Sequence, residues 1–162
     1  MDWHSESNDA VGIVDATLRD YAGRGVLQNL RVVPGKRAGA EFHFAWLHHQ
    51  PFTLTCDARR NRLALIDLLP GVQSASMMHK ELRAFLRSRS SADLPEHRRV
   101  DPQRAVVASR VRDGLVSIEL TLHGQEYEYG TRKLINMGHE VFLFLSEYWA
   151  DYMCKTFQLN AE

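Results

Sequence analysis

The sequence predicts an α+β fold: a twisted antiparallel β-sheet with an N-terminal helix, a mid-chain helix and a long C-terminal helix packed on it. Three observations predict this architecture. Helix-like and strand-like stretches occur in separate blocks along the chain. The four strand-like stretches within residues 26–69 are joined by breaks too short for crossover helices. The dipeptide Asp113-Gly114, between two runs of alternating polarity, is typical of a β-hairpin turn.

The first helix is expected over residues 8–25, because Val11, Val14 and Leu18 recur at helical spacing before a stop supplied by two glycines. Four short runs rich in β-forming residues follow it, at 26–33, 41–49, 52–58 and 62–69. Turn-length breaks separate these runs, so we expect them to form an antiparallel meander.

A second helix is expected after the Pro-Gly pair at 70–71. Ser74 or Ser76 can cap this helix, and its pattern of apolar residues at three- and four-residue spacing ends near Arg89. Residues 90–104 lose this periodicity and include two prolines, which indicates a surface loop.

Residues 105–122 carry the strongest hairpin pattern in the chain. A type I′ turn at Asp113-Gly114 pairs the two flanking runs in one register. In that register Val111 faces Val116, Ser109 faces Ile118, and Val107 faces Leu120. One face of the hairpin is then mostly apolar and the other mostly polar, which supports this pairing.

The last helix is expected over residues 131–157 and is apolar on two sides. One stripe is expected to pack on the sheet, and Gly138 within it indicates a close packing contact. The second stripe, a candidate dimer or partner interface, consists of Phe142, Leu143, Phe144, Trp149 and Met153. The protein's own core, a second copy or a partner could cover it. The segment "QEYEYG" at 125–130 either extends the hairpin or opens this helix.

Composition and charge narrow the classes of partner. Twenty basic residues balance twenty acidic ones, so there is no global attraction to nucleic acid or to an anionic membrane. The length suits a single domain, 1–162, in which residues 1–8 are expected to be flexible. The polar N-terminus lacks the apolar stretch of a signal peptide or transmembrane helix. We therefore expect a cytoplasmic protein without a membrane partner.

Histidines are concentrated in "FHFAWLHHQPFTLTC", residues 42–56, which raises the possibility of a metal site. Neighbouring residues of a strand face opposite sides, so no two of these three histidines converge from one strand. His43 or His49 could instead be joined by His123 from another strand, with Glu119 nearby; this set is the alternative hypothesis of a small enzyme or metal-dependent protein. Neither a nucleophile elbow nor a phosphate-binding glycine loop occurs. We expect ordinary sheet histidines, no catalytic residue and no cofactor.

Basic residues are locally in excess between residues 80 and 104, a segment that contains seven basic and four acidic residues. The candidate basic patch consists of Arg83, Arg87, Arg98 and Arg99. Such a patch suits RNA or an acidic partner, but Phe85 is the one aromatic residue within it, which gives base stacking little support. We therefore expect a solvated helix face and loop, and keep nucleic-acid binding as the weaker alternative.

The order of elements over residues 8–157 resembles the fold shared by type III secretion chaperones and YbjN-like proteins. In both, an N-terminal helix precedes an antiparallel sheet that is interrupted by a helix and followed by a long C-terminal helix. The resemblance implies a small, cytosolic, non-catalytic and often dimeric protein that binds segments of partner proteins. The sequence therefore predicts a non-enzymatic, chaperone- or adaptor-like protein-binding domain that forms a homodimer.

Overall fold

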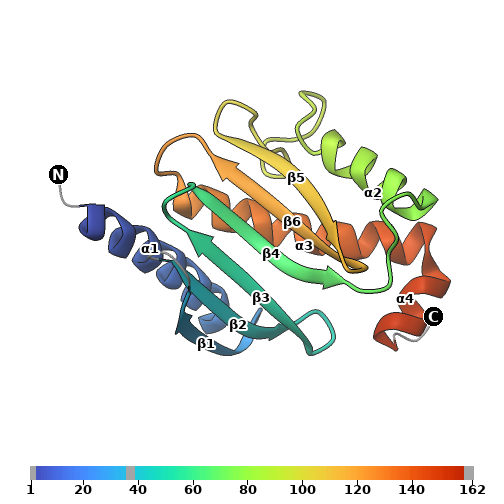
Figure 1. The fold of residues 1–162 in the computed structure, drawn as a ribbon, viewed down its shortest axis with the longest axis horizontal. Coiled ribbons are helices and arrows are strands. Elements are labelled where there is room, and N and C mark those ends of the chain that lie inside the picture. Colours follow the sequence, from blue (N-terminus) through green and yellow to red (C-terminus); the bar gives the residue numbers. More distant parts are fainter. Residues whose placement is uncertain (1–2, 36–38, 159–162) are drawn as a thin grey trace.

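The structure, a computed structural model, describes residues 3–35 and 39–158, with side chains of the first helix described from Asp9 onward. The described elements are α1 (Trp3–Gly23), β1 (Gln28–Pro34), β2 (Ala40–Trp46), β3 (Gln50–Asp57), β4 (Arg62–Leu69), α2 (Met77–Ser88), β5 (Ala105–Arg112), β6 (Leu115–Leu122), α3 (Tyr127–Tyr148) and α4 (Ala150–Phe157). This order confirms the predicted α+β fold (Figure 1). α1 begins at Trp3, within the segment expected to be flexible, and residues 1–2 lie outside the described part.

The sheet has six strands in the order β1-β2-β3-β4-β6-β5, and every neighbouring pair is antiparallel. The first four strands form the predicted meander. The hairpin joins this meander through β6, so β5 lies at the edge. Within the hairpin the predicted register is confirmed, with Val111 opposite Val116 and Val107 opposite Leu120. The turn has positive φ at both Asp113 and Gly114, as a type I′ turn requires.

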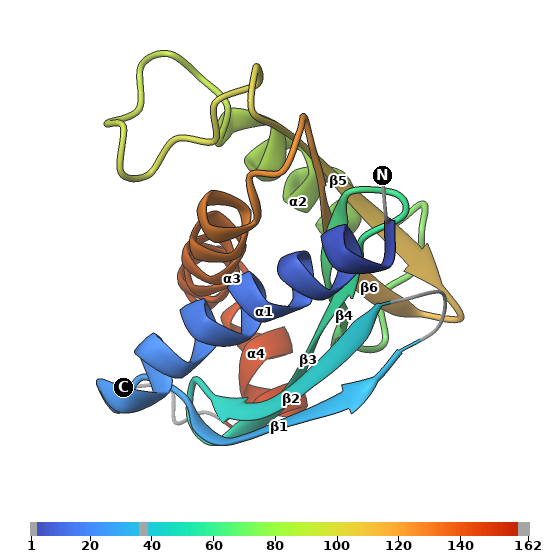
Figure 2. The same cartoon turned by 90° about the vertical axis from the view of Figure 1, so that its left-hand side faces the viewer.

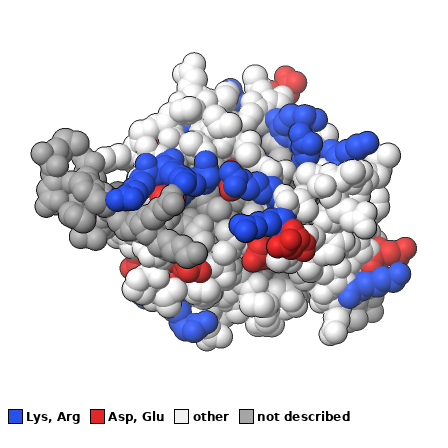
Figure 3. All heavy atoms as spheres, viewed as in Figure 1, with Lys and Arg blue, Asp and Glu red and all other residues white. Residues whose placement is uncertain are grey.

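All the helices lie on one side of the sheet (Figure 2). α1, α3 and α4 cover the face on which the strands present their buried apolar side chains, and α2 lies against β5. In β2 this face carries Phe42, Phe44 and Trp46, while the intervening residues are partly exposed. None of the described helices covers the opposite face of the sheet, across which Lys and Arg side chains form a row (Figure 3). The alternating residues of the strands thus divide into a core face and an open face.

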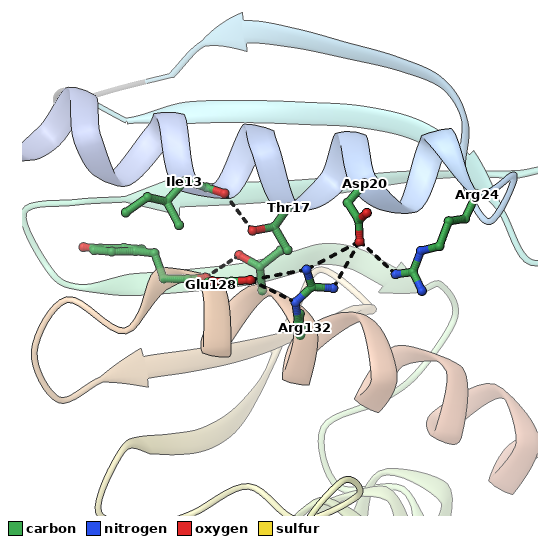
Figure 4. A network of polar contacts seen from close by, with 8 residues as sticks. Ile13, Thr17, Asp20, Arg24, Glu128 and Arg132 are labelled. Carbon is green, nitrogen blue, oxygen red and sulfur yellow. Dashed lines mark hydrogen bonds and ion pairs between the residues drawn. The ribbon is translucent and has the colours of Figure 1, made fainter.

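α1 packs beside α3. Val14 and Leu18 of α1 are fully buried in the common core. Above them, the Arg132 guanidinium of α3 lies 3.4 Å from a carboxylate oxygen of Asp20 in α1 and 3.3 Å from Glu128 of its own helix (Figure 4). These ion pairs are largely exposed, and exposed pairs contribute little to stability. Apolar burial therefore holds the two helices together.

Ser76 caps α2, one of the two caps expected. Its hydroxyl accepts a hydrogen bond from the backbone N–H of His79 at 3.2 Å. The helix ends at Ser88, with Arg89 as its C-terminal cap residue. Both ends agree with the prediction because capping depends on contacts within one turn.

The C-terminal helix begins at Tyr127 and is broken at Trp149, where the single long helix expected from the sequence divides into α3 and α4. Trp149 has φ −134° and ψ 48°, outside the helical region. Its indole N–H donates to a carboxylate oxygen of Glu81 in α2 at 2.7 Å. After the break, the Tyr152 hydroxyl donates to the carbonyl of Pro70 at 2.6 Å. The break at Trp149 and the following helix α4 are thus bonded to α2 and to the segment that precedes α2.

Gly138 makes the close contact expected of it. A Cβ atom at this position would lie 2.9 Å from Leu65 Cδ1 and 3.1 Å from two carbons of the Trp46 ring. The helix backbone approaches the sheet so closely here that even a methyl group would require the Leu65 or Trp46 side chain to move. α3 therefore lies against the sheet at a spacing that depends on this glycine.

Candidate functional site

The loop between α2 and β5, residues 89–104, extends over α3 (Figure 2) and is held there by α3 side chains. Lys133 Nζ donates to the carbonyl oxygens of Glu96 and His97 at 2.7 and 3.2 Å. The Tyr129 hydroxyl accepts a hydrogen bond from the backbone N–H of Asp101 at 2.8 Å. We refer to residues 89–104 as the α2–β5 loop.

Glu140 is the third anchor of the α2–β5 loop. It is buried, and one of its carboxylate oxygens accepts from Arg89 Nη1 at 2.7 Å while the other accepts from Arg98 Nε at 2.9 Å. The Arg89 guanidinium also lies over the Phe85 ring, 4.3 Å from its centre. A buried carboxylate that receives two arginines is well compensated, because both oxygens have charged donors.

Two concave regions flank these anchors. The first, which we call the cationic cavity, has a volume of about 710 Å³ and lies between the α2–β5 loop and the start of α3. It is lined by Leu94, Glu96, His97, Arg99, Asp101, Arg104, Tyr129 and Lys133. Its volume falls in the range typical of small-molecule sites.

The cations of this cavity differ in their partners. Arg104 is bound to the carboxylate of Glu126 through Nε at 2.7 Å and through Nη2, and its guanidinium stacks on the Tyr129 ring at 3.6 Å. Burial lowers the pKa of Lys133, because a desolvated ammonium is less favourable than a solvated one. Arg99 Nε is buried without a hydrogen-bond partner among the described residues.

The second concave region, the aromatic groove, lies between α2 and α3 and has a volume of about 400 Å³. It is lined by Phe85, Arg98, Glu140, Leu143, Phe144, Glu147 and Tyr148. Phe85 and Phe144 stack with ring centres 4.5 Å apart, and Tyr148 extends this row at 5.1 Å from Phe144. Leu143 and Tyr148 are 56% and 63% exposed, so large apolar side chains of α3 face solvent here.

The residues predicted as a dimer or partner interface do not share one surface. Phe142 and Met153 are buried in the protein's own core. Trp149 is partly exposed and bonded to α2. Leu143 and Phe144 line the aromatic groove, where the structure adds Phe85 and Tyr148 to them.

The four arginines of the predicted basic patch are also separated. Arg98 is bound to Glu140, and Arg99 lines the cationic cavity. Arg83 and Arg87 line a third cavity of about 320 Å³ against β5. These side chains therefore belong to three different sites.

The predicted metal-ligand candidates do not converge. His43 Nδ1 lies 3.1 Å from the Thr53 hydroxyl on the neighbouring strand, within hydrogen-bonding distance. His49 lies in the β2–β3 turn with φ 61°, and His123 follows the end of β6. Glu119 on the open face is paired with Arg62 and Arg110. Within residues 3–35 and 39–158, no three side chains of the metal-binding types are close enough together to hold an ion.

Cys56 is buried on the core face of the sheet. Burial, and next the charge of Asp57, raise the pKa of its thiol to about 12. We expect iodoacetamide at pH 8 to alkylate the partly exposed Cys154 in the native protein and Cys56 only after denaturation, as measured by mass spectrometry of peptides. Rapid native labelling of Cys56 would contradict this burial.

The same shift has a defined effect on stability. The folded protein favours the protonated thiol of Cys56. Its contribution to the free energy of unfolding is therefore present below pH 9, the pKa of the thiol in the unfolded chain, and is lost as the pH rises from there towards 12.

The anchors of the α2–β5 loop were not identified from the sequence. Tyr129, Lys133 and Glu140 are spaced by four and seven residues, which places them on one face of a helix. These three polar side chains share a helix face that lies between two apolar stripes, and an arginine-rich loop precedes the helix in the chain. This pattern could have indicated the three anchors from the sequence.

Comparison of the chain with protein-family models, with curated proteins and with solved structures found no match. No helix in the described part of the chain combines the length and apolar character needed to cross a membrane. The candidate sites therefore rest on the geometry of this chain alone.

Proposed function

We propose that this chain is a non-enzymatic protein-binding domain and that a second copy of the chain docks in its aromatic groove. The observation that carries the proposal is the exposure of Leu143 and Tyr148 beside the stacked pair Phe85 and Phe144. Large apolar side chains gathered in one concave region of a protein surface are typical of protein–protein interfaces.

The spacing of the groove residues on α3 supports a helical docking surface. Residues 140, 143, 144, 147 and 148 follow the three- and four-residue spacing of one helix face. The face that packs on the sheet is a different one, with Leu134, Val141 and Leu145 fully buried. The monomer's core thus leaves a second face of the helix available for an amphipathic partner helix.

Charge favours a second copy as the occupant. The net charge of the chain is zero at pH 7, so two copies do not repel each other. The groove carries one cationic and one anionic side chain that can still form an ion pair. The Nη groups of Arg98 make no hydrogen bond or ion pair to a described residue, and Glu147 has none either. In a two-fold arrangement Arg98 of each copy can face Glu147 of the other.

A chaperone- or adaptor-like role is part of this proposal. A dimer joined at the grooves leaves the open face of each sheet accessible (Figure 3). Two such faces offer extended segments of a client a larger surface than one copy provides. The resemblance to chaperone-like folds supports this role.

Association is tested by sedimentation equilibrium of the wild-type protein and of a Leu143→Asp variant. We expect the wild type to sediment as a dimer. A charge at the centre of the groove should weaken association at least ~30-fold, the effect of losing one interface hot spot. Leu143 is mostly exposed in the monomer, so the variant should fold normally.

Val106→Asp is the matched control. Val106 is 49% exposed on the edge strand β5 and does not line the groove. Its variant should dimerise like the wild type. A wild-type protein that remains monomeric, or equal weakening by both variants, would contradict docking at the groove.

A further inference from the structure

We infer that the cationic cavity binds the oxyanion group of a small molecule, a carboxylate or a phosphate, with Arg99 as its main ligand. This inference goes beyond protein binding, because the cavity and the aromatic groove are lined by different residues. It rests on the hydrogen-bond donors around the cavity for which the described residues supply no acceptor.

Arg99 differs from the other arginines around α3. Arg89, Arg98 and Arg104 each have a carboxylate partner, whereas the Arg99 side chain has no hydrogen bond or ion pair to any described residue. Its Nε is buried nonetheless. A buried donor without an acceptor is costly, and a guanidinium is shaped to bind the two oxygens of a carboxylate or phosphate.

Other donors around the cavity have unused capacity. Lys133 directs two of its three N–H groups at loop carbonyls. Arg104 uses Nε and Nη2 on Glu126, which leaves Nη1. The Tyr129 hydroxyl accepts from the backbone of Asp101, so its own proton remains to be donated. The cavity therefore has more donors than its described residues satisfy.

The acidic residues of the cavity limit the ligand's charge. One oxygen of Asp101 accepts from the backbone N–H of Gln103 at 2.9 Å, and Glu96 carries the other carboxylate. Of the three cationic side chains, Arg104 is already paired with Glu126, which leaves Arg99 and Lys133; two available cations suit a single oxyanion group rather than a polyanion such as nucleic acid. Leu94 supplies an apolar wall for the remainder of the ligand.

The inference is tested by NMR titration of the ¹⁵N-labelled protein with sodium phosphate and, separately, sodium acetate, each at an ionic strength held constant with sodium chloride. We expect saturable shifts of the Arg99 Nε–H resonance and of backbone amides near residues 129–133 with at least one probe. Saturation by phosphate alone assigns a phosphate group, and saturation by acetate alone assigns a carboxylate.

Two variants complete the experiment. Arg99→Gln should weaken binding at least 10-fold, followed through the backbone amides. Arg112→Gln, at the exposed end of β5 and outside the cavity, should bind like the wild type. The inference is overturned if neither probe saturates by about 10 mM, well above a ~1 mM dissociation constant, or if Arg99→Gln binds unchanged. The titration is repeated with the Leu143→Asp variant, in which docking at the aromatic groove is weakened. Unchanged binding of phosphate or acetate there shows that the cavity acts independently of the groove.

Discussion

Replacement of Glu140 by glutamine is expected to lower the free energy of unfolding by about 3 kcal/mol, because it leaves a buried guanidinium without its counter-charge. The side chain of Arg89 is only 10% exposed, so it cannot recover solvation by a small movement. Arg98 is 46% exposed and can turn into water. The loss therefore arises mainly at Arg89. Urea denaturation at one protein concentration measures it.

Two further variants test the origin of this loss. Glu147→Gln removes a charge from the same face of α3, but Glu147 is exposed and has no described partner within one copy; in the Leu143→Asp background, where docking at the groove is weakened, its effect should stay within about 0.5 kcal/mol. The double variant Arg89→Met, Glu140→Leu should recover much of the stability, because no buried charge remains. A loss below about 1 kcal/mol in Glu140→Gln would show that Arg89 is rehydrated.

Glu140 should also control the order of the α2–β5 loop. The loop begins beside Arg89, whose carbonyl accepts a hydrogen bond from the N–H of Val100 at 2.8 Å. In Glu140→Gln this amide should exchange its hydrogen faster than in the wild type, since the loop loses its most buried anchor. Glu140 lines the aromatic groove, and the α2–β5 loop supplies most of the residues that line the cationic cavity, so the shape of both should be disturbed together.

Gly138→Leu is expected to lower the free energy of unfolding by about 2–3 kcal/mol, the range of an overpacked core. A Cβ atom at Gly138 would already lie within 3.1 Å of Leu65 and Trp46, both of which are buried in the sheet. A leucine at this position must push α3 away from the sheet. The gain in helix propensity, on the order of 1 kcal/mol, is too small to offset this cost. Thermal and urea denaturation measure the difference.

Gly12→Leu is the matched control for this substitution. Gly12 is exposed on α1, and a Cβ atom added there would meet nothing within 4 Å. Here the same change should raise stability by up to about 1 kcal/mol through helix propensity alone. Equal effects at the two glycines would contradict the close approach of α3 to the sheet.

Local interactions explain what could be predicted from the sequence. The cap at Ser76 acts within one turn of α2, and the register of the β5–β6 hairpin follows from the two residues of its turn. The alternation of Phe42, Phe44 and Trp46 follows from the geometry of one strand. Each of these features depends on residues that are neighbours in the chain, so the pattern of residue types was sufficient.

The sites depend on contacts between distant residues. Arg89 and Arg98 meet Glu140 across 51 and 42 residues, and the break of the last helix involves Glu81, which is 68 residues from Trp149. Both apolar stripes of that helix were visible in the sequence. Which residues of the second stripe are buried depends on how α3 is rotated against the sheet, and this rotation places Phe142 in the core and Leu143 at the surface.

The sequence by itself determined the fold class, the strands, the first two helices and the hairpin register, because hydrophobic periodicity, capping and turn chemistry act over a few residues. Only the tertiary structure decided the strand order, the separation of the four arginines of the predicted basic patch into three sites and the position of the α2–β5 loop over α3. The physical reason is that a buried charge selects its partner by proximity in the folded chain and by the cost of remaining unpaired. That selection has no periodic signature in the sequence.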